Sequence, residues 1–162
     1  MKGPDRVRAA LEAAGVQCTI HTLPDSTRTA AEAAAAVGCA VGEIAKTLVF
    51  RAGASAVIAI MSGDNRLDTG KLAATLGEEV GRADADFVRA TTGFAIGGVP
   101  PLGYPTPVAV FMDADLFRFA EVWAAGGSPF SVFPIEPDRL RDVSGATVAD
   151  LKVEPGAGAA TT

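Results

Sequence analysis

Histidine and cysteine are scarce in this chain of 162 residues, which contains one histidine and two cysteines. A Ser-His-Asp triad would depend entirely on His21, which lies in an alternating, strand-like stretch and is interpreted as structural. Cys18 and Cys39 are too few for a disulfide framework, so they favour a cytoplasmic protein in which both are packed as free thiols. With a single histidine beside them they make a poor zinc site, and we expect no metal.

Long apolar runs and excess positive charge are also missing. No apolar stretch could span a bilayer, and the N-terminus is charged and helical in pattern, unlike a signal peptide. Without such a stretch, a membrane is not an expected partner. The net charge of −5 argues against a broad nucleic-acid-binding surface, so DNA is not an expected partner either. This charge does not exclude a protein that binds only the end of an RNA. No Gly-x-Gly-x-x-Gly follows a strand to open a helix, and no cofactor is expected.

The residues that are present predict an ordinary globular domain, since 49% are hydrophobic and 20% charged. Strands without regular helical crossovers favour a single α+β domain with a mixed sheet. The domain is expected to occupy residues 1–153, and the tail at 154–162 has no apolar period and is expected to be disordered. Helices are predicted at 4–14, 29–37, 68–77, 84–89 and 137–143, and strands at 16–23, 46–52, 56–62, 107–113, 119–125, 128–135 and 147–153.

Two features carry possible chemistry. Lys46 stands at the entry to a strand that should be buried, and lysine is rarely buried without a partner. A solvated strand-end lysine and a functional one are about equally compatible with that position. The second feature is GFAIGGVPPLGY at 93–104, where glycines permit close approach of a ligand and prolines fix the chain. This loop is either an apolar structural turn or a set of fixed backbone amides around a carbonyl site.

The acidic pairs have simpler interpretations. Asp84 and Asp86 suit the N-terminus of a helix, where carboxylates interact favourably with the macrodipole. The segment GDNRLD at 63–68 lacks the later glutamate of a calcium loop and is interpreted as a turn followed by a helix cap.

Four segments, KTLVF, SGDNRLDTGKLAATLG, TTGFAIGGVPPLG and EVWAAGGSPFSVF, together resemble the YbaK/ProX family of aminoacyl-tRNA deacylases. This family is related to the editing domain inserted in bacterial prolyl-tRNA synthetases. The resemblance covers nearly the whole chain and implies a mixed, mostly antiparallel, barrel-like sheet covered by helices. It also implies trans-editing, the hydrolysis of mischarged aminoacyl-tRNA, with tRNA-Pro carrying cysteine or alanine as the expected substrate.

The resemblance assigns roles to residues of this sequence. Lys46, Gly97 and Gly98 would be catalytic, with Lys46 supplying positive charge and the loop amides holding the ester carbonyl. The residues expected to bind substrate are Thr47, Phe94, Ile96, Val99, Leu102, Gly103 and Ser128. No side-chain nucleophile is needed, because attack in this family is attributed to water or to groups of the substrate. The partners implied are the aminoacyl-tRNA acceptor end and prolyl-tRNA synthetase.

Some positions depart from the family pattern. Pro100 replaces a serine that is common in the loop, and alanine-specific relatives often have Lys-Asn where this chain has Lys46 and Thr47. Amino-acid specificity is therefore left open. The alternative function is a non-catalytic module of the same fold that binds tRNA acceptor ends or a synthetase.

Overall fold

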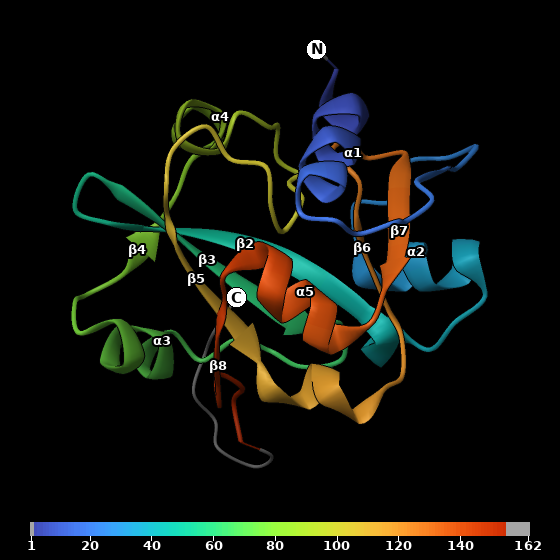
Figure 1. The fold of residues 1–162 in the computed structure, drawn as a ribbon. Helices are drawn as coiled ribbons and strands as arrows, with labels where there is room; N and C mark the ends of the chain where they lie inside the picture. Colours follow the sequence, from blue (N-terminus) through green and yellow to red (C-terminus); the bar gives the residue numbers. More distant parts are fainter. Residues whose placement is uncertain (1, 155–162) are drawn as a thin grey trace.

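A long antiparallel hairpin forms the middle of the sheet in the computed structural model, which describes residues 2–154 (Figure 1). Strand β2 (Ile44–Ala52) pairs with β3 (Ser55–Ser62) in a register that runs from Ala45 opposite Ser62 to Ala52 opposite Ser55. Both strands are rich in β-branched and apolar residues, which suit a pleated, buried surface. The chain reverses at Gly53, whose φ of 60° is readily adopted only by glycine. The predicted hairpin is confirmed.

One mixed sheet contains all the strands described. Its order is β1-β7-β6-β2-β3-β5-β8, with β4 pairing to β2 outside this path. The pairs β1–β7, β2–β3, β2–β4 and β6–β7 are antiparallel, whereas β2–β6, β3–β5 and β5–β8 are parallel. The other strands are β1 (His21–Thr22), β4 (Gly81–Arg82), β5 (Ala109–Asp113), β6 (Val122–Ala125), β7 (Ser131–Ile135) and β8 (Thr147–Ala149). The predicted α+β class, with a mixed and mostly antiparallel sheet, is confirmed.

Five helices within residues 2–154 cover the sheet, and three of them begin at a side-chain cap, of which those at Asp68 and Asp84 were expected from the sequence. Thr29 and Glu32 form a capping box at the start of α2, while Asp68 and Asp84 accept backbone hydrogen bonds at the starts of α3 and α4. The helices are α1 (Gly3–Ala13), α2 (Ala30–Val37), α3 (Thr69–Leu76), α4 (Ala85–Thr92) and α5 (Pro137–Ser144), with short 3₁₀ turns η1 (Val41–Glu43) and η2 (Ala114–Arg118). None of these helices is long and apolar enough to cross a membrane.

Apolar side chains form three clusters around the sheet. In Figure 1, α1 and α4 lie above the central hairpin and α3 lies below it. The largest cluster includes Val7, Leu11, Ile58, Ile60, Met112, Phe133 and Leu140. A second, around Leu72 of α3, contains Phe50, Met61 and Leu151, and a small third cluster joins Ala33 and Ala34 of α2 to Ile44 and Trp123. The third cluster fixes α2 against the start of β2.

The strand predicted at 16–23 is much shorter than expected. Only His21 and Thr22 pair with β7, opposite Val132 and Ser131. The same register would place Thr19 opposite Pro134. Proline has no N–H to donate, so the ladder ends there and the preceding segment leaves the sheet.

The C-terminal prediction lies largely outside the described residues. Of the tail expected at 154–162, only Glu154 is described, and its carboxylate pairs with the Lys71 ammonium at 2.8 Å.

Helix α4 leads directly into the glycine- and proline-rich loop, and its start depends on Asp84, whose carboxylate accepts from the Phe87 N–H at 2.8 Å. We expect Asp84→Ala to lower the free energy of unfolding by about 1 kcal/mol, because one helix donor loses its partner, and Asp84→Asn to be tolerated. Asp86→Ala, in the same turn but without that hydrogen bond, is the matched control. Equal destabilisation by both alanine variants in urea unfolding would contradict the capping role.

Candidate functional site

Strand β2 changes partner along the edge that faces away from β3. Its start, Ile44–Ala45, pairs with β6, and its end, Phe50–Arg51, pairs with β4, which leaves an opening at 46–49. The Gly63 N–H donates to the Ile44 carbonyl at 2.8 Å, so Ile44 directs its backbone groups toward β3. Because backbone directions alternate along a strand, Thr47 directs its N–H and carbonyl into the opening.

A pocket of about 630 Å³ occupies this opening. Its walls come from β2, β6, β7, α2, the segment before α2 and the loop between α4 and β5. The lining residues are Thr27, Arg28, Thr29, Ala30, Ala31, Ala33, Val41, Ile44, Ala45, Lys46, Thr47, Leu48, Gly63, Ile96, Gly97, Val99, Trp123, Ala124, Ala125 and Val132. Five residues assigned to the site from the sequence therefore meet here: Lys46, Thr47, Ile96, Gly97 and Val99.

Lys46 is a half-buried cation in this pocket. Among the residues that the structure describes, its ammonium has no ion-pair or hydrogen-bond partner within contact distance. Burial lowers the pKa of Lys46 from its ordinary value, while the carboxylates of Asp64 and Asp113 oppose that shift. The amine therefore lies in a negative field without being neutralised by direct contact.

A buried polar network underlies the end of β3, close to Lys46 in the sheet. The carboxylate of Asp113, 1% exposed, accepts from the Ser62 N–H at 3.1 Å, the Asn65 side chain at 2.8 Å and the Asp115 N–H at 2.9 Å. Asn65 also donates to Asp115, which is paired with Lys152 at 2.8 Å. The segment interpreted as a turn before a helix thus has a structural role, and it fixes the carboxylates that face the lysine.

Thr47 contributes a second polar group. Its hydroxyl is buried and has no hydrogen-bond partner among the described residues. Burying an unsatisfied hydroxyl costs free energy, so such atoms are uncommon in folded proteins. The polar groups that Thr47 directs into the opening next to Lys46 are therefore its backbone N–H and carbonyl.

The loop at 93–104 is held in place from behind. Arg6 of α1 donates to the Gly93 carbonyl at 2.8 Å and stacks over the ring of Phe94 at 4.5 Å. The hydroxyl of Tyr104 donates to the carbonyl of Pro100, and burial raises the pKa of that tyrosine. Pro100, where the resemblance led us to expect a serine, is buried and is not among the residues that line the pocket.

Several residues expected to bind substrate lie elsewhere. Phe94 and Leu102 are buried in the main apolar cluster, and Gly103 packs near Ala10 of α1. Ser128 shares a 2.7 Å hydrogen bond with the Ser131 hydroxyl in the turn before β7. These four support the walls of the pocket rather than line it.

Gly98 also differs from the expectation. Its N–H donates to the Ala95 carbonyl at 3.1 Å, so this amide is already engaged within the loop. A side chain at this position would collide with the turn at 128–129, because an added Cβ would lie 2.7 Å from the Cα of Ser128. Gly98 therefore permits close packing of two loops, whereas Gly97, with φ at 95°, lines the pocket itself.

Among the lining residues that were not predicted from the sequence, Arg28 and Trp123 have the side chains best suited to bind a ligand. Arg28 lies in a polar segment before α2 and follows no motif, and it is exposed at the pocket. Trp123 sits in a short strand where an aromatic residue usually indicates core packing. As the chain's single tryptophan it could have been singled out, but only the fold shows that it borders the same pocket as Lys46.

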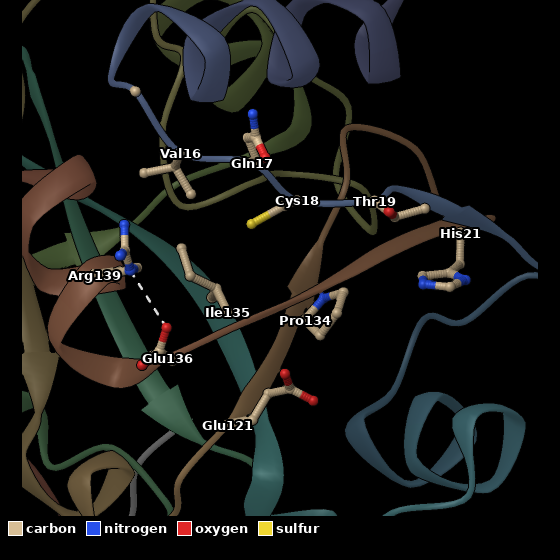
Figure 2. Close-up of a pocket in the computed structure, with 11 residues that line it drawn as sticks. Val16, Gln17, Cys18, Thr19, His21, Glu121, Pro134, Ile135, Glu136 and Arg139 are labelled. Atoms are coloured by element: carbon tan, nitrogen blue, oxygen red, sulfur yellow. Dashed lines mark ion pairs between the residues drawn. The ribbon is translucent and has the colours of Figure 1, made fainter.

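A second hollow of about 570 Å³ lies beside the point where the 16–20 segment leaves β7 (Figure 2). Cys18 and His21 line it together with Glu121, Glu136 and Arg139, and Arg139 pairs with Glu136 at 3.3 Å. Burial raises the pKa of the Cys18 thiol, which disfavours the nucleophilic thiolate. Residues 2–154 contain no group of three or more His, Cys, Asp or Glu side chains arranged to hold a metal ion.

Comparison with known proteins identifies the family of this chain. The model of the aminoacyl-tRNA editing domain matches residues 24–143. The chain belongs to this family. The match confirms the resemblance found in the sequence, and it spans the segment before α2, Lys46, the loop and Trp123.

Individual relatives place the chain within the family. It is 33% identical to the uncharacterized protein YwhH of Bacillus subtilis over 120 residues, covering 74% of this chain and 76% of that protein. It is 29% identical to the proline–tRNA ligase of a Thermoanaerobacter species over 128 residues, which are 77% of this chain but 22% of the ligase. A crystal structure described as a "putative trans-editing enzyme for prolyl tRNA synthetase" is 47% identical, with a TM-score of 0.90 and coverage of 95% and 99% of the two chains.

The contact between Gly98 and the 128–129 turn gives a test of the pocket's architecture. We expect Gly98→Ala to lower the free energy of unfolding by about 1–3 kcal/mol, since the added methyl group forces one of the two loops to move. Gly77→Ala is the control for backbone strain alone, because Gly77 has φ at 86° and nothing within 4 Å of an added Cβ. A larger loss for Gly77→Ala than for Gly98→Ala in thermal melting would contradict the packing role.

Proposed function

We propose that this protein is an aminoacyl-tRNA deacylase that acts in trans on mischarged tRNA. The observation that carries the proposal is the half-buried Lys46, which lines the same pocket as Gly97 and the open backbone edge at Thr47. A cation and backbone groups converging on one space suit an ester whose carbonyl oxygen becomes negative during hydrolysis.

The proposed reaction uses water as the nucleophile. Water attacks the ester carbonyl carbon, the bond from that carbon to the terminal ribose oxygen breaks, and the ribose hydroxyl leaves with a proton. Lys46 stabilises the charge that develops on the carbonyl oxygen. The described lining contains no cysteine or serine, and it has no histidine that could activate the threonines at 27, 29 and 47, which favours attack by water or by a group of the substrate itself.

The pocket also supports a substrate with a small amino acid. Its inner wall is made by Val99, Val132 and the two alanines at 124–125, which leave room for a short apolar side chain beside the ester. The similarity to proline–tRNA ligases and to the structure described as a trans-editing enzyme supports tRNA-Pro as the RNA, and the small lining side chains suit alanine or cysteine as the amino acid. Prolyl-tRNA synthetase, in the cytoplasm, is the partner that would generate such errors.

Arg28 is suited to the RNA side of the substrate. It is exposed at the pocket, and the chain as a whole carries a net charge of −5. A small number of cations near the pocket would favour contact with the few phosphates of an acceptor end rather than with a long duplex.

Replacing Lys46 tests the catalytic proposal. We expect Lys46→Ala to slow single-turnover hydrolysis of alanyl- or cysteinyl-tRNA-Pro by about 10²–10³-fold, the loss associated with one preorganised electrostatic group. Lys46→Arg should recover little, because a planar guanidinium does not place its charge as a compact ammonium does. Lys71→Ala, which removes a lysine on α3 paired with Asp150 and Glu154, is the control and should retain activity. If Lys46→Ala hydrolyses the substrate at the parental rate, this lysine is only a solvated residue at the end of a strand. If the parent protein hydrolyses none of a full panel of mischarged tRNAs, the alternative of a non-catalytic module is favoured.

The pH profile tests whether Lys46 acts as a cation. Since burial lowers the pKa of Lys46, the enzymatic rate should be full below that lowered pKa and fall as the pH rises through it, at a lower pH than an exposed lysine would give. Asp64→Asn removes a charge that raises this pKa, so the alkaline fall should move to still lower pH. Asp142→Asn, an exposed carboxylate on α5, is the control, and uncatalysed hydrolysis is subtracted throughout. An identical alkaline limb in the parent and Asp64→Asn would exclude the charged form as the active one.

A further inference from the structure

Trp123 presents an aromatic surface to the pocket next to the proposed ester site. It is half-buried in β6, pairs in register with Ile44 of β2, and projects from the same face of the sheet as Ile44. Lys46, two residues after Ile44 on β2, projects from that face as well. The tryptophan and the lysine are therefore near neighbours on adjacent strands.

The two sides of the indole have different surroundings. On one side His21 packs against it, with ring centroids 5.4 Å apart and planes inclined by 58°. Toward α2 the neighbours are alanines, and Ala30, Ala31 and Ala33 line the pocket. Because the indole and these alanines line the same pocket, and alanine side chains are short, open space lies beside the indole on the side of α2.

The chemistry of the substrate places a flat group close to this gap. In any aminoacyl-tRNA the amino acid is esterified to the ribose of the terminal adenosine, so adenine lies only a few bonds from the ester. Nucleobases stack on aromatic side chains, because every base has a π face. An ester carbonyl held at Lys46 and Gly97 would leave the attached base within reach of Trp123.

We infer that Trp123 and the alanine wall of α2 form a binding slot for the terminal adenine of the substrate, an inference that rests on the proposed function. The amino acid occupies the inner, valine-lined part of the pocket, the ester lies between Lys46 and Gly97, and the base stacks on the indole. Arg28, on the segment before α2, then lies on the side where the chain of phosphates leaves the pocket. Trp123 is in this scheme a binding residue and takes no part in the chemical step.

The single tryptophan makes the slot directly observable, because its fluorescence reports one side chain. Titration with adenosine 5′-monophosphate should change the tryptophan emission saturably, and ribose 5-phosphate at the same concentrations should not. The nucleotide should also inhibit deacylation competitively. If adenosine 5′-monophosphate leaves the emission unchanged and does not compete, the slot is wrong.

Two variants test the slot during turnover. Trp123→Ala should raise KM by roughly 5- to 150-fold, the range for losing one base–aromatic stack, with a much smaller change in kcat, and Trp123→Phe should recover most of the affinity. Ala31→Leu keeps the indole and fills the gap from an exposed helix position, so it should raise KM and weaken the fluorescence response even if Trp123→Ala folds poorly. Phe117→Ala, which removes an exposed aromatic on η2, is the control and should match the parent. Unchanged KM in Ala31→Leu together with an unchanged fluorescence response would overturn the inference.

The outcomes also separate this inference from the proposed function. A parent that cleaves mischarged tRNA but shows no response to adenosine 5′-monophosphate keeps the function and loses the slot. A parent that cleaves no mischarged tRNA but binds adenosine 5′-monophosphate at Trp123 loses the catalytic proposal and keeps an adenine site.

Discussion

Strand β2 bonds to β6 at its start and to β4 at its end, and the four residues between these pairings have a free edge. The proposed deacylase site and the proposed adenine slot both depend on this opening at 46–49. It lets one pocket reach both faces of the sheet, so that Lys46 from one face and the backbone of Thr47 at the edge border the same space. A continuous sheet would have used these backbone groups in a ladder and closed the opening.

The surrounding loops and helices keep the opening at 46–49 accessible and form its walls. The loop at 93–104 is fastened to α1 through Arg6, and Gly98 allows it to pack against the turn at 128–129. On the other side the capping box of Thr29 and Glu32 starts α2 at the pocket wall. The site is therefore built from loops whose positions are set by hydrogen bonds and close backbone packing, which suits a substrate that must be held before it reacts.

Local patterns were enough to predict the hairpin and the caps at Asp68 and Asp84, because each depends on residues close in sequence. The mixed sheet was predicted more coarsely, from strands that lack regular helical crossovers, and its strand order joins segments far apart in the chain. Lys46 and the glycine-rich loop could be chosen as site elements from their residue types and the family resemblance. The direction of each side chain could not be predicted, so Phe94 and Leu102 were assigned to the site although they lie in the core. Arg28 and Trp123 were missed since only the pairing of β6 with β2 and the position of α2 bring them to Lys46.

Pro134, which ends the pairing between β1 and β7, has a consequence for how copies of the protein meet. Beyond Val132 this side of β7 has no neighbouring strand among the described residues, and an unpaired edge can recruit a strand from another molecule. Register places the proline nitrogen on that open side, where a recruited strand would need a donor. The proline ring thus protects this border of the sheet from edge-to-edge aggregation, and it does so one strand away from the pocket, since Pro134 is in register with Trp123 of β6.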